Sequence, residues 1–316
     1  MANLLTFSIV QSALELGFIY ALVALALFIS FSILNIADLS TDGCFTLGCA
    51  VCAMITLKGH PVLALFAAML AGVCSGFITA FLQTKLGIPS ILAGIIVNTA
   101  LYTVNIAVMG FASNVNLFQC ESIFTWAKDI LPVGPSKLIV VAVIVIIVGV
   151  FIGFFLNTRL GLSIRATGDN PDMVRASSIN TNLMIIIGLC VANALTGLSG
   201  GLLAQYQKSC DINLGTGMVT IALASLIIGE SIFGKGGMLK RIVGVVFGSC
   251  LYRFIVAIAL RLNVPAECLK LVSAIIVAIA IALPYIKQQS LFRRQRRAAK
   301  TENRIYIEEM QGRKEE

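Results

Sequence analysis

Long apolar runs separated by short polar segments make up most of the chain. A helix needs about 20 apolar residues to cross a bilayer, and on this rule the runs predict eight spans and a ninth candidate. The eight spans are expected at about 8–33, 43–57, 61–82, 89–112, 138–157, 183–204, 214–233 and 242–262, and the ninth at about 268–286. The pattern therefore predicts an all-α fold, a polytopic transmembrane helical bundle of about eight or nine spans.

Composition and charge also place the chain in a membrane. Of its 316 residues 58% are hydrophobic and 12% are charged, whereas soluble domains carry about 25% charged residues. A net charge of +8 would suggest a nucleic-acid ligand in a soluble protein. Here the basic residues lie beside apolar runs, where they set topology and anchor the chain in the lipid bilayer, so no nucleic acid is expected. We predict a membrane domain over 1–290 and a cytoplasmic tail over 291–316, basic at first and then of mixed charge.

The basic residues predict which side each loop occupies, because cytoplasmic loops carry an excess of Lys and Arg. Six of them follow the last apolar run and place the C-terminus in the cytoplasm: Lys287, Arg293, Arg294, Arg296, Arg297 and Lys300. Counting back by alternation puts 158–182 inside, 113–137 outside and 35–42 inside. The inside segments then hold 16 basic residues and the outside segments 6, which supports the alternation.

The longest polar interruption, residues 158–182, carries the signs of a short helix with a defined start. Asp169 or Asn170 can cap its free N–H groups, Pro171 suits the first helical position, and Asp172 lies in the first turn, where the helix dipole favours an anion. A helix of about two turns is not stable alone. We therefore expect it to dock against another protein.

That partner is predicted to be a separate cytoplasmic ATPase. Met173, Val174 and Ser177 can share one face of the short helix and meet the partner, and the arginines mark the cytoplasmic side. The residues predicted to couple the chain to the ATPase are Arg165, Asp169, Asn170, Pro171, Asp172, Met173, Val174 and Arg175.

A second polar interruption, residues 35–43, lies between the first two apolar runs and contains Asp38, Ser40, Thr41 and Asp42. Non-helical backbone at membrane depth occurs only where it is buried in protein or lines a wet cavity. One interpretation is a broken helix at the translocation path, as in many transporters. The other is an ordinary cytoplasmic turn with Asp38 or Asp42 as a cap. The residue types favour neither.

Polar side chains also form stripes within two predicted spans. Asn98, Tyr102 and Asn105 share one helix face, and Asn193, Thr196 and Ser199 recur every three residues. Polar stripes in hydrocarbon must face the bundle interior. They either line a solute path or hold helices together by hydrogen bonds, and for any single residue adhesion is the more common role.

Three charges fall within or near predicted spans: Glu15, Glu230 and Arg253. Each is costly there unless it is paired or reaches water. For Glu230 and Arg253 an ion pair, or a side chain reaching the membrane surface, is favoured over contact with a solute.

Nothing in the sequence supports catalysis on this chain. Residues 229–236, GESIFGKG, resemble a phosphate-binding loop, but Gly236 occupies the position of its required Ser or Thr, so any ATP is expected to be hydrolysed on another chain. His60 is the single histidine, and the lone pair Cys49 and Cys52 has no second pair to complete a metal site. Neither catalytic residues nor a bound metal is expected. Cys120 and Cys210 both fall in predicted external loops, and a disulfide between them stays open.

Several motifs resemble those of a known family. Residues 17–25, GFIYALVAL, and 38–48, DLSTDGCFTLG, resemble the opening of ABC importer permeases of the branched-chain amino acid and ribose type. Further motifs are similar to those of tryptophan/tyrosine transport-system permeases within that superfamily: RATGDNPDM at 165–173, NALTGLSGG at 193–201, AQYQ at 204–207, YR at 252–253 and LKLVSA at 269–274. The likeness covers about residues 10–285.

The resemblance implies a permease in the plasma (inner) membrane of a bacterium. It would form a homodimer with the solute path on its twofold axis and receive solute from an extracytoplasmic substrate-binding protein. Residues 171–177 would be the coupling helix in a groove of the ATPase, which would hold ATP and Mg. About eight crossings would be usual for the family, and an aromatic amino acid such as tryptophan or tyrosine would be the solute.

Other functions remain as alternatives at this point. The solute of such a permease could instead be a branched-chain amino acid, a sugar or a nucleoside. A secondary transporter typically has two similar halves and protonatable residues mid-span, and no matching halves are found here. A non-transporting membrane scaffold would use the polar stripes for adhesion alone.

Overall fold

The computed structural model describes residues 7–130, 135–234 and 236–261 together with scattered positions between 271 and 296. Within these residues six helices are long and apolar enough to cross a membrane. They are α1 (Phe7–Leu27, continued by the π-helical turn η1, Phe28–Ile33), α3 (Pro61–Thr84), α4 (Ser90–Val108), α6 (Ser136–Phe155), α9 (Thr181–Gln207) and α11 (Met238–Arg261). The predicted all-α membrane bundle is confirmed.

Two apolar helices are shorter than a full span: α2 (Thr41–Leu57) and α10 (Met218–Phe233). They correspond to the second and seventh predicted spans, so each apolar run up to residue 261 forms a helix. Most of the ninth candidate, 268–286, and most of the basic residues that orient the C-terminus lie outside the described residues.

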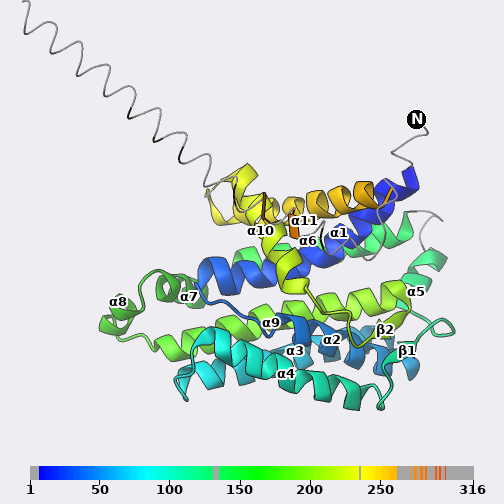
Figure 1. Ribbon diagram of the computed structural model, residues 1–316, viewed down its shortest axis with the longest axis horizontal. Helices are drawn as coiled ribbons and strands as arrows, with labels where there is room; N and C mark the ends of the chain where they lie inside the picture. The colour runs from blue at the N-terminus through cyan, green and yellow to red at the C-terminus, as the bar shows by residue number, and fades with distance from the viewer. Residues whose placement is uncertain are drawn as a thin grey trace, which may run out of the picture.

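The helices run roughly along the long axis of the bundle, and α9 lies at its centre (Figure 1). At one end, which we call the α8 end, lie α7 (Arg159–Asp169) and α8 (Pro171–Ala176). At the other, the sheet end, lie α5 (Ile123–Ile130) and two antiparallel strands, β1 (Asn114–Asn116) and β2 (Ser209–Asp211), with Val115 opposite Cys210. The segment 158–182, predicted inside, and the segment 113–137, predicted outside, thus have their helices and strand at opposite ends of the bundle.

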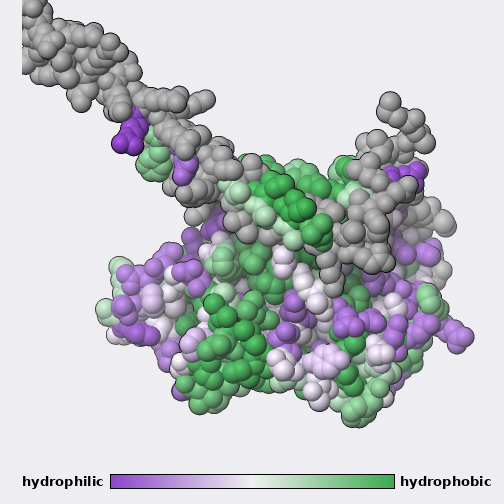
Figure 2. Space-filling view, in the orientation of Figure 1, coloured by the Kyte–Doolittle hydropathy of each residue, from purple (hydrophilic) through white to green (hydrophobic). Residues whose placement is uncertain are grey.

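Small residues allow α9 to pack closely against its neighbours. A side chain on Gly197 would collide with the carbonyl oxygen of Ala68 in α3, and one on Gly72 would collide with the carbonyl oxygen of Asn193. Close backbone approach between such residues is the usual way in which membrane helices associate. The helices that flank this core expose apolar side chains, and Figure 2 shows a hydrophobic surface at the lower left, where Figure 1 draws the first part of α4.

The cysteines open to question are not bridged. Cys120 and Cys210 are both free thiols. Cys210 is buried and its Sγ lies 3.9 Å from the Sδ of Met109. Cys49 and Cys52 are buried as well, as expected for small apolar residues.

Candidate functional site

The predicted short helix is present as α8, and its start shows how the sequence specifies it. The Asn170 side chain accepts hydrogen bonds from the backbone N–H groups of Asp172 and Met173, each at 3.1 Å. Pro171 occupies the first helical position. The cap is therefore Asn170 and not Asp169, which is the last residue of α7. The short polar side chain of Asn170 fits the extended backbone between the two helices.

Met173 and Val174 of α8 lie in different environments, one exposed and one buried, which corrects the prediction that they meet the partner on one shared face. Val174 is 5% exposed and holds α8 against the bundle, while Met173 is 70% exposed. Adjacent helical residues point about 100° apart, so only one of the two can pack inward. Met173 thus forms an apolar tip at the α8 end, and a pair between Asp172 and Arg175, 3.4 Å long, lies beside it.

Helix α7 connects α8 to the interior. Ile164 of α7 is fully buried, and Gly168 lies so close to the carbonyl oxygen of Ile33 that no side chain fits there. Arg175 of α8 donates a hydrogen bond from Nε to Thr181 Oγ1 at the start of α9, at 3.1 Å. The α7–α8 unit therefore contacts the end of η1 and the start of α9 at once.

The chain between η1 and α2 is irregular and buried. Asp38, Ser40 and Thr41 are each no more than 3% exposed. Asp38 Oδ1 accepts from the backbone N–H and the hydroxyl of Ser40, at 2.9 and 2.6 Å, and Oδ2 accepts from the side-chain amide of Asn193 at 2.8 Å. Thr79 of α3 donates to the Ser40 hydroxyl at 3.2 Å.

This burial decides between the two interpretations of residues 35–43. Asn193 lies about halfway along α9, about 18 Å from its first residue at a rise of about 1.5 Å per residue. The segment bonded to it is therefore deep in the bundle. The segment is a buried break between helices and not an exposed turn, and its placement at the inner face stays a prediction. Asn193 and Ser199 act as adhesive residues, because Ser199 donates to the Ile19 carbonyl of α1 at 2.6 Å.

The two short helices meet at their N-termini. Asp42, in the first turn of α2, accepts hydrogen bonds from the backbone N–H groups of Gly217 and Val219, both at 2.9 Å. Gly217 precedes α10 and has φ +89, a conformation that favours glycine. The positive ends of two helix dipoles thus lie near one carboxylate inside the bundle. Interrupted helices that present their termini to a site are a known feature of transporters.

A polar pocket of about 190 Å³ lies beside this junction. It is lined by Asp42, Gly43, Thr46, Asn98, Thr99, Tyr102, Asn105, Ile212, Asn213 and Thr216. In Figure 2 pale and purple residues interrupt the green surface in the region where Figure 1 draws the loop between β2 and α10. The predicted stripe of α4 therefore meets Asp42 at one pocket.

Asn105 is the most deeply placed residue of that stripe. It is 1% exposed, and its Nδ2 donates to the Gly43 carbonyl at 3.1 Å. Its Oδ1 is buried without a hydrogen-bond partner among the described residues. Tyr102, by contrast, is 53% exposed at the rim. The pocket thus offers an unused acceptor in its depth and an aromatic ring at its opening.

The other path candidates lie elsewhere. Asp38, Ser40 and Asn193 form the buried network described above, Thr41 donates to the Asp38 carbonyl at 3.1 Å, and Thr196 donates to the Ala192 carbonyl within its own helix at 3.3 Å. Conversely, the pocket uses the loop 212–216, which the sequence prediction divided between an external loop and a span. Gly215 and Gly217 precede most of this apolar run. They were the sequence signal that α10 begins at Met218 and not at residue 214, where the span was predicted to begin.

The charges near the spans have structural partners. Glu230 pairs with Arg241 at 2.5 Å and accepts from the Ser32 hydroxyl at 2.8 Å, which confirms the predicted ion pair and identifies its partner. The guanidinium of Arg253 lies 3.9 Å from the centroid of the Tyr20 ring. Glu230 and Arg253 therefore do not pair with each other, and neither lines the polar pocket.

Comparison with known proteins identifies the family. The model of the family described as "Branched-chain amino acid transport system / permease component" matches residues 9–283. The chain is 33% identical over 272 residues to a tyrosine transport system permease protein of Clostridioides difficile, covering 86% of this chain and 90% of the relative. It is 30% identical to an uncharacterised protein of Rickettsia prowazekii, covering 90% and 100% respectively.

More distant relatives include the ribose import permease protein of Escherichia coli K12, which is 26% identical over 79% of this chain and 78% of its own length. No solved structure matches the chain significantly. The family model matches most of the bundle. This agrees with the motifs found in the sequence, which include those at the start of α2 and in α7–α8. The chain belongs to the family of branched-chain amino acid transport system permease components.

Proposed function

We propose that this permease is the membrane-spanning subunit of an ATP-driven importer for an amino acid, and that the solute is aromatic, such as tyrosine or tryptophan. The observation that carries the proposal is α8, a helix capped by Asn170 that is anchored by Val174 and presents the exposed Met173. A helix of about two turns with a buried anchor and an apolar tip at the end of a membrane bundle suits a groove on another protein. The printed name of the 33% identical relative supports the aromatic solute.

In this proposal the energy enters through packing at α8. ATP and Mg are bound by a separate cytoplasmic ATPase, and the α8 end and the C-terminus face the cytoplasm. An extracytoplasmic substrate-binding protein delivers the solute at the sheet end. Because Gly168 abuts the end of η1, a displacement of α7–α8 by the ATPase would reach the buried break and the short helices that follow it.

The polar pocket is the proposed contact with the solute. Its volume of about 190 Å³ is smaller than the roughly 300–1,000 Å³ of a typical ligand pocket, and Thr99 and Tyr102 leave its rim exposed. A second copy of the chain facing this rim would complete a larger site on a twofold axis. Asn98, Tyr102 and Asn105 would then line the path from both copies.

The test is reconstitution of the chain in proteoliposomes with its ATPase and binding protein, measuring tyrosine uptake and ATP hydrolysis in parallel. Met173→Asp is expected to lower uptake at least tenfold and to abolish the stimulation of ATP hydrolysis by the loaded binding protein, whereas Met173→Leu keeps the apolar tip and both activities. Unchanged uptake in Met173→Asp would refute the role of α8. Uptake that persists without ATP and collapses with the ion gradient would instead establish a secondary transporter.

A further inference from the structure

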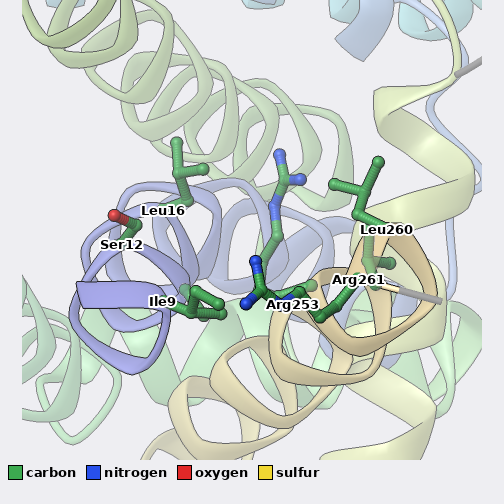
Figure 3. Close-up of a pocket in the computed structure, with 9 residues that line it drawn as sticks. Ile9, Ser12, Leu16, Arg253, Leu260 and Arg261 are labelled. Carbon is green, nitrogen blue, oxygen red and sulfur yellow. The ribbon is translucent and has the colours of Figure 1, made fainter. Parts of the chain in front are cut away.

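A second hollow lies away from the polar pocket, between α1 and α11 (Figure 3). It has a volume of about 380 Å³. It is lined by Ile9, Ser12, Ala13 and Leu16 of α1 and by Arg253, Val256, Ala257, Leu260 and Arg261 of α11. Figure 3 shows the two arginines and Leu260 on one side of this crevice and Ile9, Ser12 and Leu16 on the other. Two cations therefore line a hollow whose walls are otherwise mostly apolar.

The crevice follows the two helices from their ends at the sheet end toward the interior. Arg261 is the last residue of α11, and Arg253 lies about 12 Å before it at about 1.5 Å per residue. Ile9 is the first residue of the apolar span of α1. The hydrocarbon core of a bilayer begins roughly at such helix ends, and headgroups lie just beyond it. The crevice thus covers the depth of a lipid headgroup and the first part of its acyl chains.

Neither arginine has an ion-pair partner in the part of the chain that the structure describes. The Arg253 Nε atom is buried and has no hydrogen-bond acceptor among the described residues, while its guanidinium lies over Tyr20. Glu15, the carboxylate on this stretch of α1, is already held by the Tyr206 hydroxyl at 2.8 Å and by the Gln11 amide at 2.9 Å. The crevice therefore has unused guanidinium donors where an anion can approach from the lipid.

We propose that this crevice binds an anionic phospholipid of the leaflet at the sheet end. The headgroup phosphate is held by Arg253 and Arg261, because a guanidinium presents a planar fork that suits phosphate oxygens. The acyl chains lie against apolar residues further along the crevice, such as Leu16 and Val256. A free phosphate shares the headgroup contacts but not the apolar ones, so the apolar walls select a lipid. The site is independent of the solute and of the ATPase.

The experiment uses the full-length chain in nanodiscs that contain equal amounts of phosphatidylglycerol and phosphatidylcholine, with retained lipid measured by native mass spectrometry on release. We expect the wild-type chain to retain phosphatidylglycerol in preference to phosphatidylcholine. The double variant Arg253→Gln, Arg261→Gln is expected to retain it at least tenfold less, since it removes both guanidinium groups that would form charge-assisted hydrogen bonds to the phosphate. Lys58→Gln removes an exposed cation between α2 and α3 at the same end and is expected to behave as wild type.

Because loss of the Arg253 contact with Tyr20 can also weaken folding, Arg261→Gln is tested alone. Arg261 is exposed at the end of α11, so its loss should leave the thermal unfolding midpoint unchanged and still lower phosphatidylglycerol retention several-fold. Three results would overturn the proposal. The first is that the wild-type chain retains both lipids equally. The second is that the double variant and Arg261→Gln retain as much phosphatidylglycerol as the wild-type chain. The third is that glycerol phosphate displaces the lipid at equal concentration.

Discussion

The junction of α2 and α10 gives the sharpest test of how the buried helix starts are held. Asp42 accepts two backbone hydrogen bonds at 2.9 Å, from Gly217 and Val219. Asp42→Ala removes both acceptors and leaves two N–H groups at the N-terminus of α10 without partners. Asp42→Asn keeps one oxygen, so it can satisfy one of the two donors and loses the charge that faces the helix dipole.

The size of the effect follows from these contacts. A hydrogen bond to a charged group contributes about 1.5–3 kcal/mol, which gives about 3–6 kcal/mol for two. Asp42 is half-buried beside the polar pocket, so water can replace part of what is lost, and we expect about 2 kcal/mol for Asp42→Ala. At about 1.4 kcal/mol per factor of ten, that is an increase of roughly thirtyfold in local opening. Asp42→Asn should cost about 1 kcal/mol, or roughly fivefold.

Hydrogen exchange is the suitable assay, because it reports opening at individual helix starts. The peptide that covers 217–222 should exchange roughly thirtyfold faster in Asp42→Ala, while peptides from α9 keep their protection. Asp172→Asn, which changes an exposed carboxylate of α8, serves as the control and should leave 217–222 unaffected. Equal protection of 217–222 in wild type and Asp42→Ala would show that Asp42 does not hold α10, and the buried junction would have to be abandoned.

Two further predictions concern the α8 end. Gly168→Ala should displace α7 from η1, because an added Cβ collides with the Ile33 carbonyl oxygen. Overpacking of this kind costs about 1–3 kcal/mol, so hydrogen exchange in α7 should rise at least fivefold. Unaltered exchange in α7 would contradict the contact. Glu230→Gln should lower the thermal unfolding midpoint through a loss of about 1–2 kcal/mol, because it leaves Arg241, only 17% exposed, without its charge partner; an unchanged midpoint would show that the pair contributes little.

Local features of the fold follow directly from the sequence. Each apolar run up to residue 261 forms a helix, because the length and hydrophobicity of a run do not depend on its neighbours. The start of α8 is also local, since Asn170 and Pro171 act on atoms within three residues of themselves. The identity of the buried residue in α8 is not local. Met173 and Val174 are both apolar, and which of them packs inward depends on how α8 meets the bundle.

The depth of the break between η1 and α2 could not be predicted for a similar reason. Asp38 and Ser40 are as common in a surface turn as in a buried break, and their burial depends on Asn193, 155 positions later in the chain. The junction at Asp42 joins residues 175 positions apart, and Glu230 finds its partner across a helix pair. Pairings of this kind depend on how whole helices pack against one another. The pattern of apolar and polar residues along the chain does not contain that information.

The arrangement of the breaks bears on how force at one end could alter the middle of the bundle. A continuous helix transmits a displacement along its axis, but its hydrogen-bond ladder resists a change of direction midway. Here η1, which contacts Gly168 of α7, leads into a break that is fixed by single side-chain bonds from Asp38, and the next helix starts at a carboxylate shared with α10. Such bonds contribute about 1.5–3 kcal/mol each and can exchange partners one at a time. A partner that moves α8 would therefore shift the start of α2, and with it the wall of the polar pocket, without unfolding any spanning helix.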